Sequence, residues 1–146
     1  MLVVAEFIAL FCTTLFTGAA IYINLVEHPA RMGCETKIAA TVWAPSYKLA
    51  TGMQASLAIF GSLAGMAAWL VGGSALWLVA AVLLGLVVPF TFIGIMPTNR
   101  ALLAPSRDLS SPETRALLEK WGRLHAARSL LSLLASLVLV WVVVGA

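Results

Sequence analysis

Charge is scarce in this 146-residue chain, at only 10% of residues, and it is missing almost entirely from three long stretches. Residues 2–26, 49–96 and 129–146 together contain a single charged side chain, Glu6. A soluble domain in which 62% of residues are hydrophobic would expose far too much apolar surface to water. The shortage of charge therefore excludes a soluble globular protein and predicts an integral membrane protein.

Cysteine is also rare. Cys12 lies in the first apolar stretch and Cys34 in the loop that follows, so the rise of the helix keeps them apart, and there is no CxxC motif. This excludes a disulfide framework and a membrane thiol oxidoreductase. The net charge is only +3, and acidic residues interleave with the basic ones. We therefore expect no nucleic-acid partner, since a membrane-proximal basic collar explains the charge.

The apolar stretches divide into four helices by length. A helix needs ~20 apolar residues to cross the ~30 Å hydrocarbon core. The middle stretch is too long for one crossing and is interrupted at Gly72-Gly73-Ser74. The first stretch lacks the basic start of a signal peptide, so we expect it to be retained. We predict one all-α domain, residues 1–146, a four-helix membrane bundle with spans near 2–26, 49–71, 74–96 and 112–145.

Two helical segments are expected outside the hydrocarbon core. Ser110 and Glu113 have the spacing of a capping box, and Pro112 suits a first helical turn. The fourth helix therefore begins in water and has an extended cytoplasmic start. Between the first two spans, residues 35–43 are expected to form a short interfacial helix that ends before Pro45.

All nine Lys and Arg residues lie in two stretches, 31–48 and 100–128. Cytoplasmic loops of membrane proteins carry an excess of basic residues. This pattern places both basic loops in the cytoplasm and both termini outside. It predicts an integral protein of the bacterial inner membrane.

Two spans carry stripes at helical spacing. The stripe on the first span is polar, so it should look into the bundle rather than toward lipid. Its members are Glu6, Thr13, Thr17, Asn24 and His28. The stripe on the second span is made of small residues and includes Gly61 and Gly65, a GxxxG that lets two backbones approach closely. This face is expected to pack helices within the bundle, or to join subunits of an oligomer or a larger membrane complex.

The reactive side chains gather at the cytoplasmic end of the predicted bundle. Four of them form a candidate catalytic set: His125, Arg128, Asn99 and His28. Further residues are expected to line a substrate pocket around this set: Asn24, Glu27, Arg100, Trp121, Trp43 and Tyr47. Pro89 predicts a kink in the third helix, which either steers its end or opens a cavity beneath the surface.

This set has the groups needed to deprotonate a small hydrophobic molecule, aromatic or quinone-like. A neutral imidazole can act as a general base near neutral pH, and we assign that role to His125. Arg128 and Asn99 would stabilise the phenolate or enolate that forms, with His28 as a second acid–base group or ligand. Such an anion reacts with dioxygen, and this chemistry requires no metal.

Two other interpretations stay open. His28 and His125 lie on different helices at similar depth, so they could be the axial ligands of a haem, or bind a metal with Glu27 as a third ligand. No HxxxH or ExxH motif supports this, and no cofactor is favoured. Alternatively, the polar groups only hold the helices together, in a non-catalytic accessory subunit of a larger membrane complex.

The motifs also resemble a known family. The chain has HPA after the first span, MPTNRALL after the third and WGRLHAAR in the fourth helix. This combination is similar to the anthrone oxygenase-like membrane proteins. The family pattern falls on Pro29, on Pro97, Asn99 and Leu102, and on Trp121, His125 and Arg128. The resemblance implies a four-helix integral membrane protein and, as in fungal members, oxygenation of anthrones to anthraquinones without a known cofactor.

Overall fold

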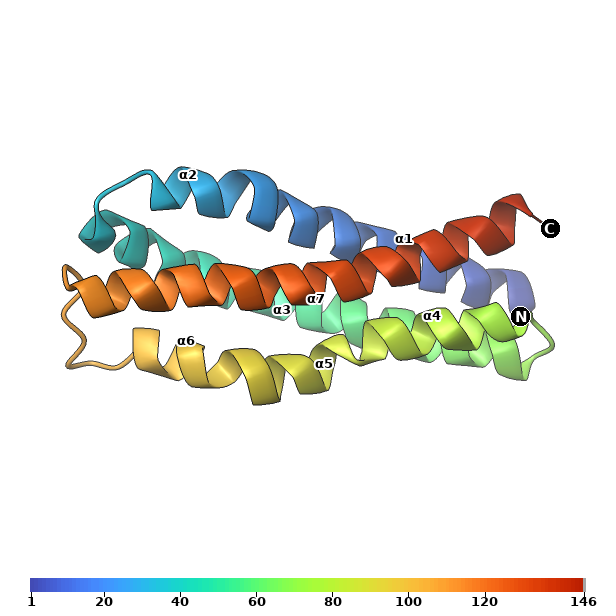
Figure 1. The fold of residues 1–146 in the computed structure, drawn as a ribbon. Helices are drawn as coiled ribbons and strands as arrows, with labels where there is room; N and C mark the ends of the chain where they lie inside the picture. Colours follow the sequence, from blue (N-terminus) through green and yellow to red (C-terminus); the bar gives the residue numbers. More distant parts are fainter. Residues whose placement is uncertain (146) are drawn as a thin grey trace.

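Apolar helices make up most of the chain in the computed structural model, which describes residues 1–145. Within that range there are no strands, and four helical segments are long and apolar enough to cross a membrane. Figure 1 shows the four segments side by side as one bundle, with both termini at the same end. The predicted all-α, four-helix membrane bundle is confirmed.

The first span continues past the predicted boundary at residue 26 and contains a π-helical turn. Its parts are helix α1 (Leu2–Tyr22), the π-helical turn η1 (Ile23–Glu27) and helix α2 (His28–Met32). The polar stripe faces inward, since Thr13, Thr17 and His28 are buried. The Thr17 hydroxyl donates to the carbonyl of Ser132 on the fourth span at 2.8 Å, which ties the stripe to its neighbour.

The second span is one continuous helix, α3 (Thr36–Leu70). The short interfacial helix expected at 35–43 is therefore wrong as a separate element. The helix continues through Pro45 because Pro45 and Thr41 are exposed on its outer side. There the Thr41 carbonyl, which loses its amide partner to proline, can be satisfied by water or headgroups. On the inner side Trp43 is buried, so this face of the helix packs into the bundle on the N-terminal side of Pro45 as well.

The third span is interrupted near its middle and extends beyond the predicted end at residue 96. Its parts are α4 (Ala75–Gly85), α5 (Val87–Phe90), the π-helical turn η2 (Thr91–Ile95) and α6 (Met96–Leu102). Pro89 has no amide hydrogen to donate to the carbonyl of Gly85, the last residue of α4. The interruption therefore falls where Pro89 predicts it, and a π-helical turn follows directly.

The fourth span is helix α7 (Pro112–Val144). The hydroxyl of Ser111, not Ser110, caps it by accepting from the Thr114 amide at 3.2 Å. The Ser110 amide instead donates to the Asp108 carboxylate at 2.8 Å within the preceding turn, so the predicted capping box is one residue out of register. With 33 residues the helix is about 50 Å long, more than the hydrocarbon core requires.

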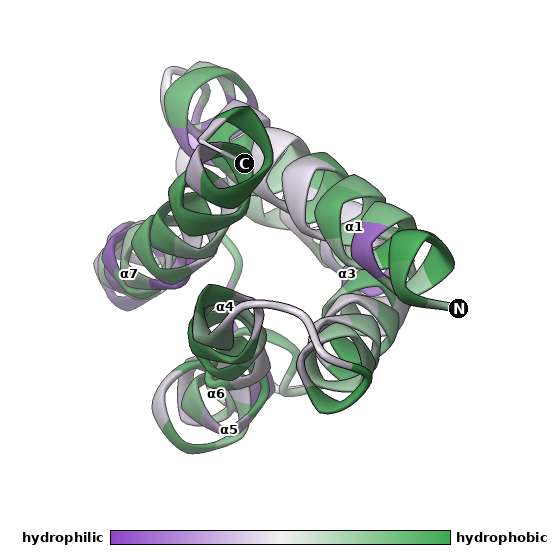
Figure 2. Ribbon diagram, turned by 90° about the vertical axis from the view of Figure 1, so that its right-hand side faces the viewer, coloured by the Kyte–Doolittle hydropathy of each residue, from purple (hydrophilic) through white to green (hydrophobic). Residues whose placement is uncertain are grey.

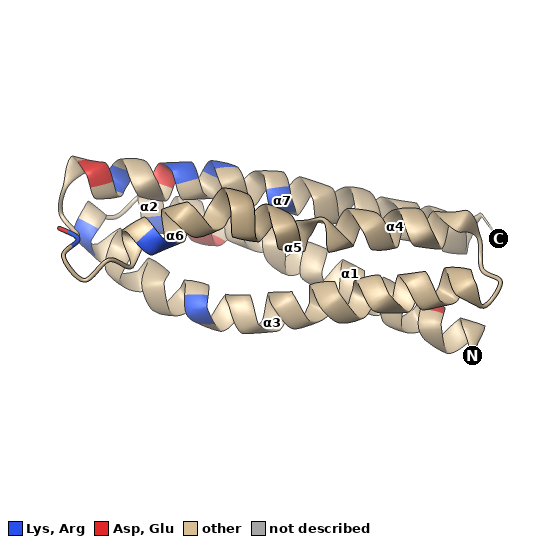
Figure 3. Ribbon diagram, turned by 90° about the horizontal axis from the view of Figure 1, so that it is seen from below, with Lys and Arg blue, Asp and Glu red and all other residues tan. Residues whose placement is uncertain are grey.

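Charge separates the two ends of the bundle. Figure 3 shows Lys and Arg gathered toward the end opposite the termini, which we call the basic end. Figure 2 looks onto the other end, where the ribbons are almost entirely hydrophobic. The two loops at the basic end are those that the sequence places on one side of the membrane.

Small residues let α3 pack closely against its neighbours. A Cβ on Gly61 would lie 3.1 Å from the Cβ of Cys12 on α1, and one on Gly65 would lie 3.0 Å from the Cβ of Ala81 on α4. Both glycines are buried inside the bundle. The chain's own helices therefore occupy the Gly61/Gly65 face, as the expectation of packing within the bundle requires. Assembly with other chains stays a prediction.

Candidate functional site

A small polar cavity lies inside the bundle toward the basic end. All four spans line it, through Ile23, Arg31, Ser46, Tyr47, Ala50, Thr51, Gln54, Thr91, Ile95, Asn99, Trp121, His125 and Arg128. Its volume is about 20 Å³, which holds one or two water molecules at ~10–15 Å³ each. Both π-helical turns contribute to its wall, as such turns often do at functional sites. Gln54 lies six residues beyond Lys48, so the cavity is about 9 Å into the apolar span.

One wall is built around the imidazole of His125, which is 2% exposed. The Asn24 amide nitrogen donates to the Gly122 carbonyl at 3.2 Å, which turns the Asn24 oxygen toward His125. That oxygen lies 2.6 Å from Nδ1 of His125 and also accepts from the Ser129 hydroxyl at 2.5 Å. Because the oxygen can only accept, Nδ1 carries the proton. Nε2 of His125 therefore keeps its lone pair, as a general base requires.

The guanidinium of Arg128 lies next to this lone pair. It donates to Nε2 of His125 at 3.0 Å and to the side-chain oxygen of Gln54, and it lies 5.5 Å above the ring of Phe16. All three partners are neutral. Within residues 1–145 no carboxylate forms an ion pair with Arg128. A charge at this depth normally pairs with an opposite charge, so the cavity is electrostatically suited to an anion.

Several other buried donors in the cavity wall have no hydrogen-bond partner within the part of the chain that the structure describes. They are Nε of Arg31, Nε2 of Gln54, Nδ2 of Asn99, Nε1 of Trp121 and Nε of Arg128, against one unpartnered acceptor in the same wall, Oδ1 of Asn99. Gln54 and Asn99 are each only 1% exposed. Buried polar groups are expensive unless they are satisfied, so this surplus of donors indicates an acceptor-rich ligand such as an oxyanion.

Aromatic rings close one side of the cavity. Trp43 stacks on Tyr47 with ring centroids 5.0 Å apart and meets Trp121 edge-on at 5.8 Å. Trp121 in turn packs against His125 at 4.8 Å and His28 at 5.2 Å. The two imidazole centroids are therefore at most 10.0 Å apart, the sum of those two separations.

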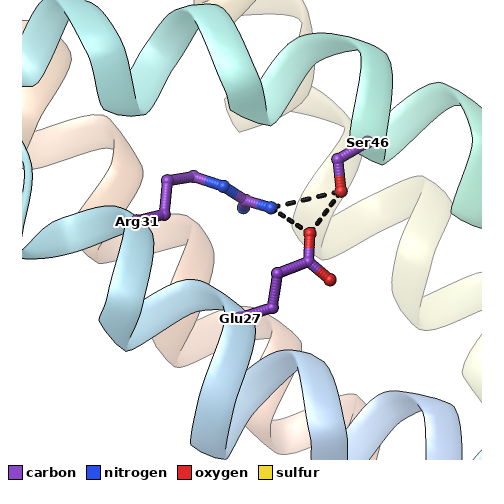
Figure 4. A network of polar contacts seen from close by, with 3 residues as sticks. All are labelled: Glu27, Arg31 and Ser46. Atoms are coloured by element: carbon purple, nitrogen blue, oxygen red, sulfur yellow. Dashed lines mark hydrogen bonds and ion pairs between the residues drawn. The ribbon is translucent and has the colours of Figure 1, made fainter.

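The end of the cavity nearest the basic loops is closed by an ion pair. Figure 4 shows the Arg31 guanidinium reaching across to Glu27 on its own span and to Ser46 on α3. The Ser46 hydroxyl also donates to the Glu27 carboxylate. Arg31 is buried and lines the cavity, and its charge is neutralised by Glu27. Unlike Arg128, it has no need of an external anion.

The structure brings most of the predicted site residues together, but five of the ten do not line the cavity. Asn99, Trp121, His125, Arg128 and Tyr47 line it directly, while Asn24 and Trp43 support it from behind. Arg100 is exposed on the outer side of α6. Glu27 holds Arg31 from outside the cavity, and His28 is separated from it by the indole of Trp121. Arg100, Glu27 and His28 therefore do not line this cavity, and their roles at the site stay predictions.

The haem or metal alternative does not fit this geometry. The Trp121 ring packs against both His28 and His125, so it occupies the place that a haem between two axial imidazoles would need. Glu27 is already paired with Arg31. Among residues 1–145 no group of three or more His, Cys, Asp or Glu side chains is arranged to hold a metal ion.

Of the cavity residues that carry a charge or an amide, sequence reasoning missed two, Gln54 and Arg31. Gln54 is the only amide side chain in residues 49–96. A lone amide in a membrane span normally has a polar partner on another helix, and that was the available signal. Arg31 was passed over for Arg100, since both follow the end of an apolar stretch and the sequence does not distinguish their directions.

Comparison with known proteins bears on what this cavity does. The family model described as anthrone oxygenase matches residues 43–138. This range includes Gln54, Asn99, Trp121, His125 and Arg128, whereas Asn24 on the first span lies before it. No solved structure matches the chain.

A curated relative agrees with the family model. Over 53 residues the chain is 42% identical to the anthrone oxygenase tpcL of Aspergillus fumigatus, a stretch that covers 34% of this chain and 33% of that protein. The alignment thus spans about a third of the relative. Because the family model covers well over half of this chain, including three of its four spans, the chain belongs to the anthrone oxygenase family.

Proposed function

We propose that this oxygenase-like membrane protein binds an enolisable aromatic ketone of the anthrone class with its carbonyl oxygen at the polar cavity and deprotonates it for reaction with dioxygen. The observation that carries the proposal is Arg128, a half-buried cation whose partners are all neutral. An enolate oxygen would supply the missing negative charge. The unpartnered donors of Gln54 and Asn99 would complete its coordination, as in an oxyanion hole.

His125 is the proposed base. It lines the cavity, and its Nε2 carries a lone pair because Asn24 holds the proton on Nδ1. In the resting arrangement the Arg128 guanidinium donates a hydrogen bond to that lone pair. As negative charge develops on the substrate oxygen, the guanidinium would turn toward it and release Nε2 to take the proton. Asn24 and His28 are positioning residues in this scheme, since Asn24 fixes the tautomer of His125 and His28 supports Trp121.

The reaction balances with dioxygen as the only oxidant. His125 removes one proton from the methylene carbon of the ketone, and the electron pair becomes the enolate. Dioxygen takes up these electrons and bonds to the former methylene carbon. One of its oxygen atoms stays as the new carbonyl, and the other leaves as water with the two methylene hydrogens. Anthrone and dioxygen thus give anthraquinone and water.

Turnover of anthrone by the purified protein tests this proposal. We expect oxygen uptake and anthraquinone formation in equal amounts, well above the rate in protein-free membranes. The visible spectrum and metal content should be measured on the same sample, since a Soret band would indicate haem and contradict the scheme. No turnover, together with stable co-purification of other membrane subunits, would favour the accessory-subunit interpretation instead.

The orientation of the bundle is a further part of the proposal, with the basic end in the cytoplasm of a bacterial cell. It is supported by the gathering of Lys and Arg at one end of the structure (Figure 3). Reporter fusions after Gly73 and after Asp108 are expected to report opposite sides of the membrane, with Asp108 inside. Reporters on the same side would overturn the topology.

A further inference from the structure

A second cavity, apolar and about 90 Å³ in volume, adjoins the polar cavity. The two cavities share five lining residues, namely Tyr47, Thr51, Gln54, Thr91 and Arg128. The second cavity extends from these polar groups between α3 and the third span. Its inner wall is made of buried apolar side chains, among them Phe16 and Val87. A molecule in it would therefore have its polar end at Arg128 and its apolar body among hydrocarbon side chains.

The outer rim of this cavity reaches the surface of the bundle. Ala55 on α3 and Phe92 on η2 line the cavity and are also exposed, Phe92 to 63%. In Figure 1, α3 and the third span leave their connecting turn together and move apart toward the basic end. Ala55 lies seven residues beyond Lys48, about 10 Å into the span, so this rim faces hydrocarbon rather than water.

We infer that the apolar cavity is the subsite for the ring system of the substrate, and that it opens sideways into the bilayer between α3 and η2. The inference rests on the proposed function, which identifies the ligand as a flat aromatic ketone. It goes further by assigning Ala55 and Val88 as the residues that limit which rings can enter. At the end nearest the basic loops, Arg31 is held by Glu27 and Ser46 in the hydrogen-bonded group of Figure 4, so we place the entrance at the lipid side instead.

The volume of the subsite determines how much of the ligand it encloses. An apolar cavity of roughly 150 Å³ holds one benzene molecule, so about 90 Å³ encloses only part of one ring. The remaining rings would lie at the rim between Ala55 and Phe92, in contact with lipid. Substituents on the far ring should therefore be tolerated, whereas substituents beside the bound carbonyl should be rejected.

Binding of anthraquinone, a flat ketone with no methylene left to oxidise, tests the subsite without requiring turnover. We expect it to quench the tryptophan fluorescence of the protein in lipid nanodiscs, because Trp121 borders the polar cavity. Ala55→Phe should weaken this binding at least tenfold by filling the rim, and Val88→Phe should do so from the opposite wall. Ile59→Phe is the matched control, one turn along α3 and exposed outside the cavity, and should leave binding unchanged.

The outcomes separate this inference from the proposed function. Binding that is weakened by Ala55→Phe and Val88→Phe but not by Ile59→Phe supports the subsite, even if anthrone is not turned over. Anthrone turnover that is equal in wild type and in both cavity variants overturns the subsite and leaves the proposed function intact. Anthraquinone binding that is equal in all four proteins also overturns it, as does an absence of anthraquinone binding. Thermal melts show whether each variant is folded.

Discussion

Arg128→Met is expected to lower kcat/KM for anthrone by about 10²–10³-fold, the usual loss on removing an oxyanion-stabilising donor. Two arginines line the polar cavity, and Glu27 neutralises the charge of Arg31 but not that of Arg128. The effect should fall mainly on kcat, because the negative charge develops only in the transition state. Steady-state oxygen uptake by the purified variant measures it. Arg128→Lys should recover part of the activity, since it restores a cation without the forked geometry.

Two controls distinguish this effect from loss of folding. Arg123→Met removes an exposed arginine from the same helix and should leave activity unchanged. Arg128→Met alone leaves the Gln54 oxygen buried without a donor, which destabilises the bundle. The double variant Arg128→Met/Gln54→Leu removes both polar partners, so it should melt closer to wild type and still be inactive. A double variant that is folded and fully active would refute the role of Arg128.

His125→Phe is expected to lower kcat by about 10²–10⁴-fold, the range attributed to general acid–base catalysis. Phe preserves the packing of the ring against Trp121 but has no lone pair at the position of Nε2. His28→Phe is the informative comparison, because His28 packs against the other side of the same indole, outside the cavity. If His28→Phe costs as much kcat as His125→Phe, the base has been assigned to the wrong histidine. Unchanged turnover in His125→Phe would remove it from the mechanism altogether.

The membrane bundle could be predicted from the sequence because hydrophobic length and charge distribution determine it almost alone. The inward direction of Thr13, Thr17 and His28 followed from helical spacing, since a polar stripe in lipid is unfavourable. Trp121, His125 and Arg128 recur every three or four residues, so their common face was also readable. These predictions depend on properties local to one helix.

The pairing of Arg128 with Gln54 could not be predicted in this way. It joins α7 to α3, and the two residues are 74 positions apart in the chain. Which side chains meet across a bundle depends on the height and rotation of each helix, which in turn depend on close contacts such as that of Gly65 with Ala81. A single sequence carries no direct signal for that register.

The π-helical turns explain the errors at the helix ends. Each of them adds a residue to a helical turn, so the faces of the helix before and after it no longer follow one spacing. Beyond η2, Asn99 is buried and Arg100 is exposed, while on the first span Asn24 lies within η1 and His28 directly follows it. Extending a regular 3.6-residue pattern through these turns assigns the wrong arginine to the cavity. Neither turn has a sequence signature that we could have read.

Removal of a methylene proton of anthrone by His125 can be measured separately from the reaction with dioxygen. Anthrone is incubated anaerobically with the purified protein in deuterated buffer, and loss of its methylene hydrogens is followed by proton NMR. Wild type is expected to accelerate the exchange strongly over protein-free lipid, whereas His125→Phe and the double variant Arg128→Met/Gln54→Leu should not. Oxygen-dependent turnover by wild type without accelerated exchange, or equal exchange in all three proteins, would contradict deprotonation in this cavity.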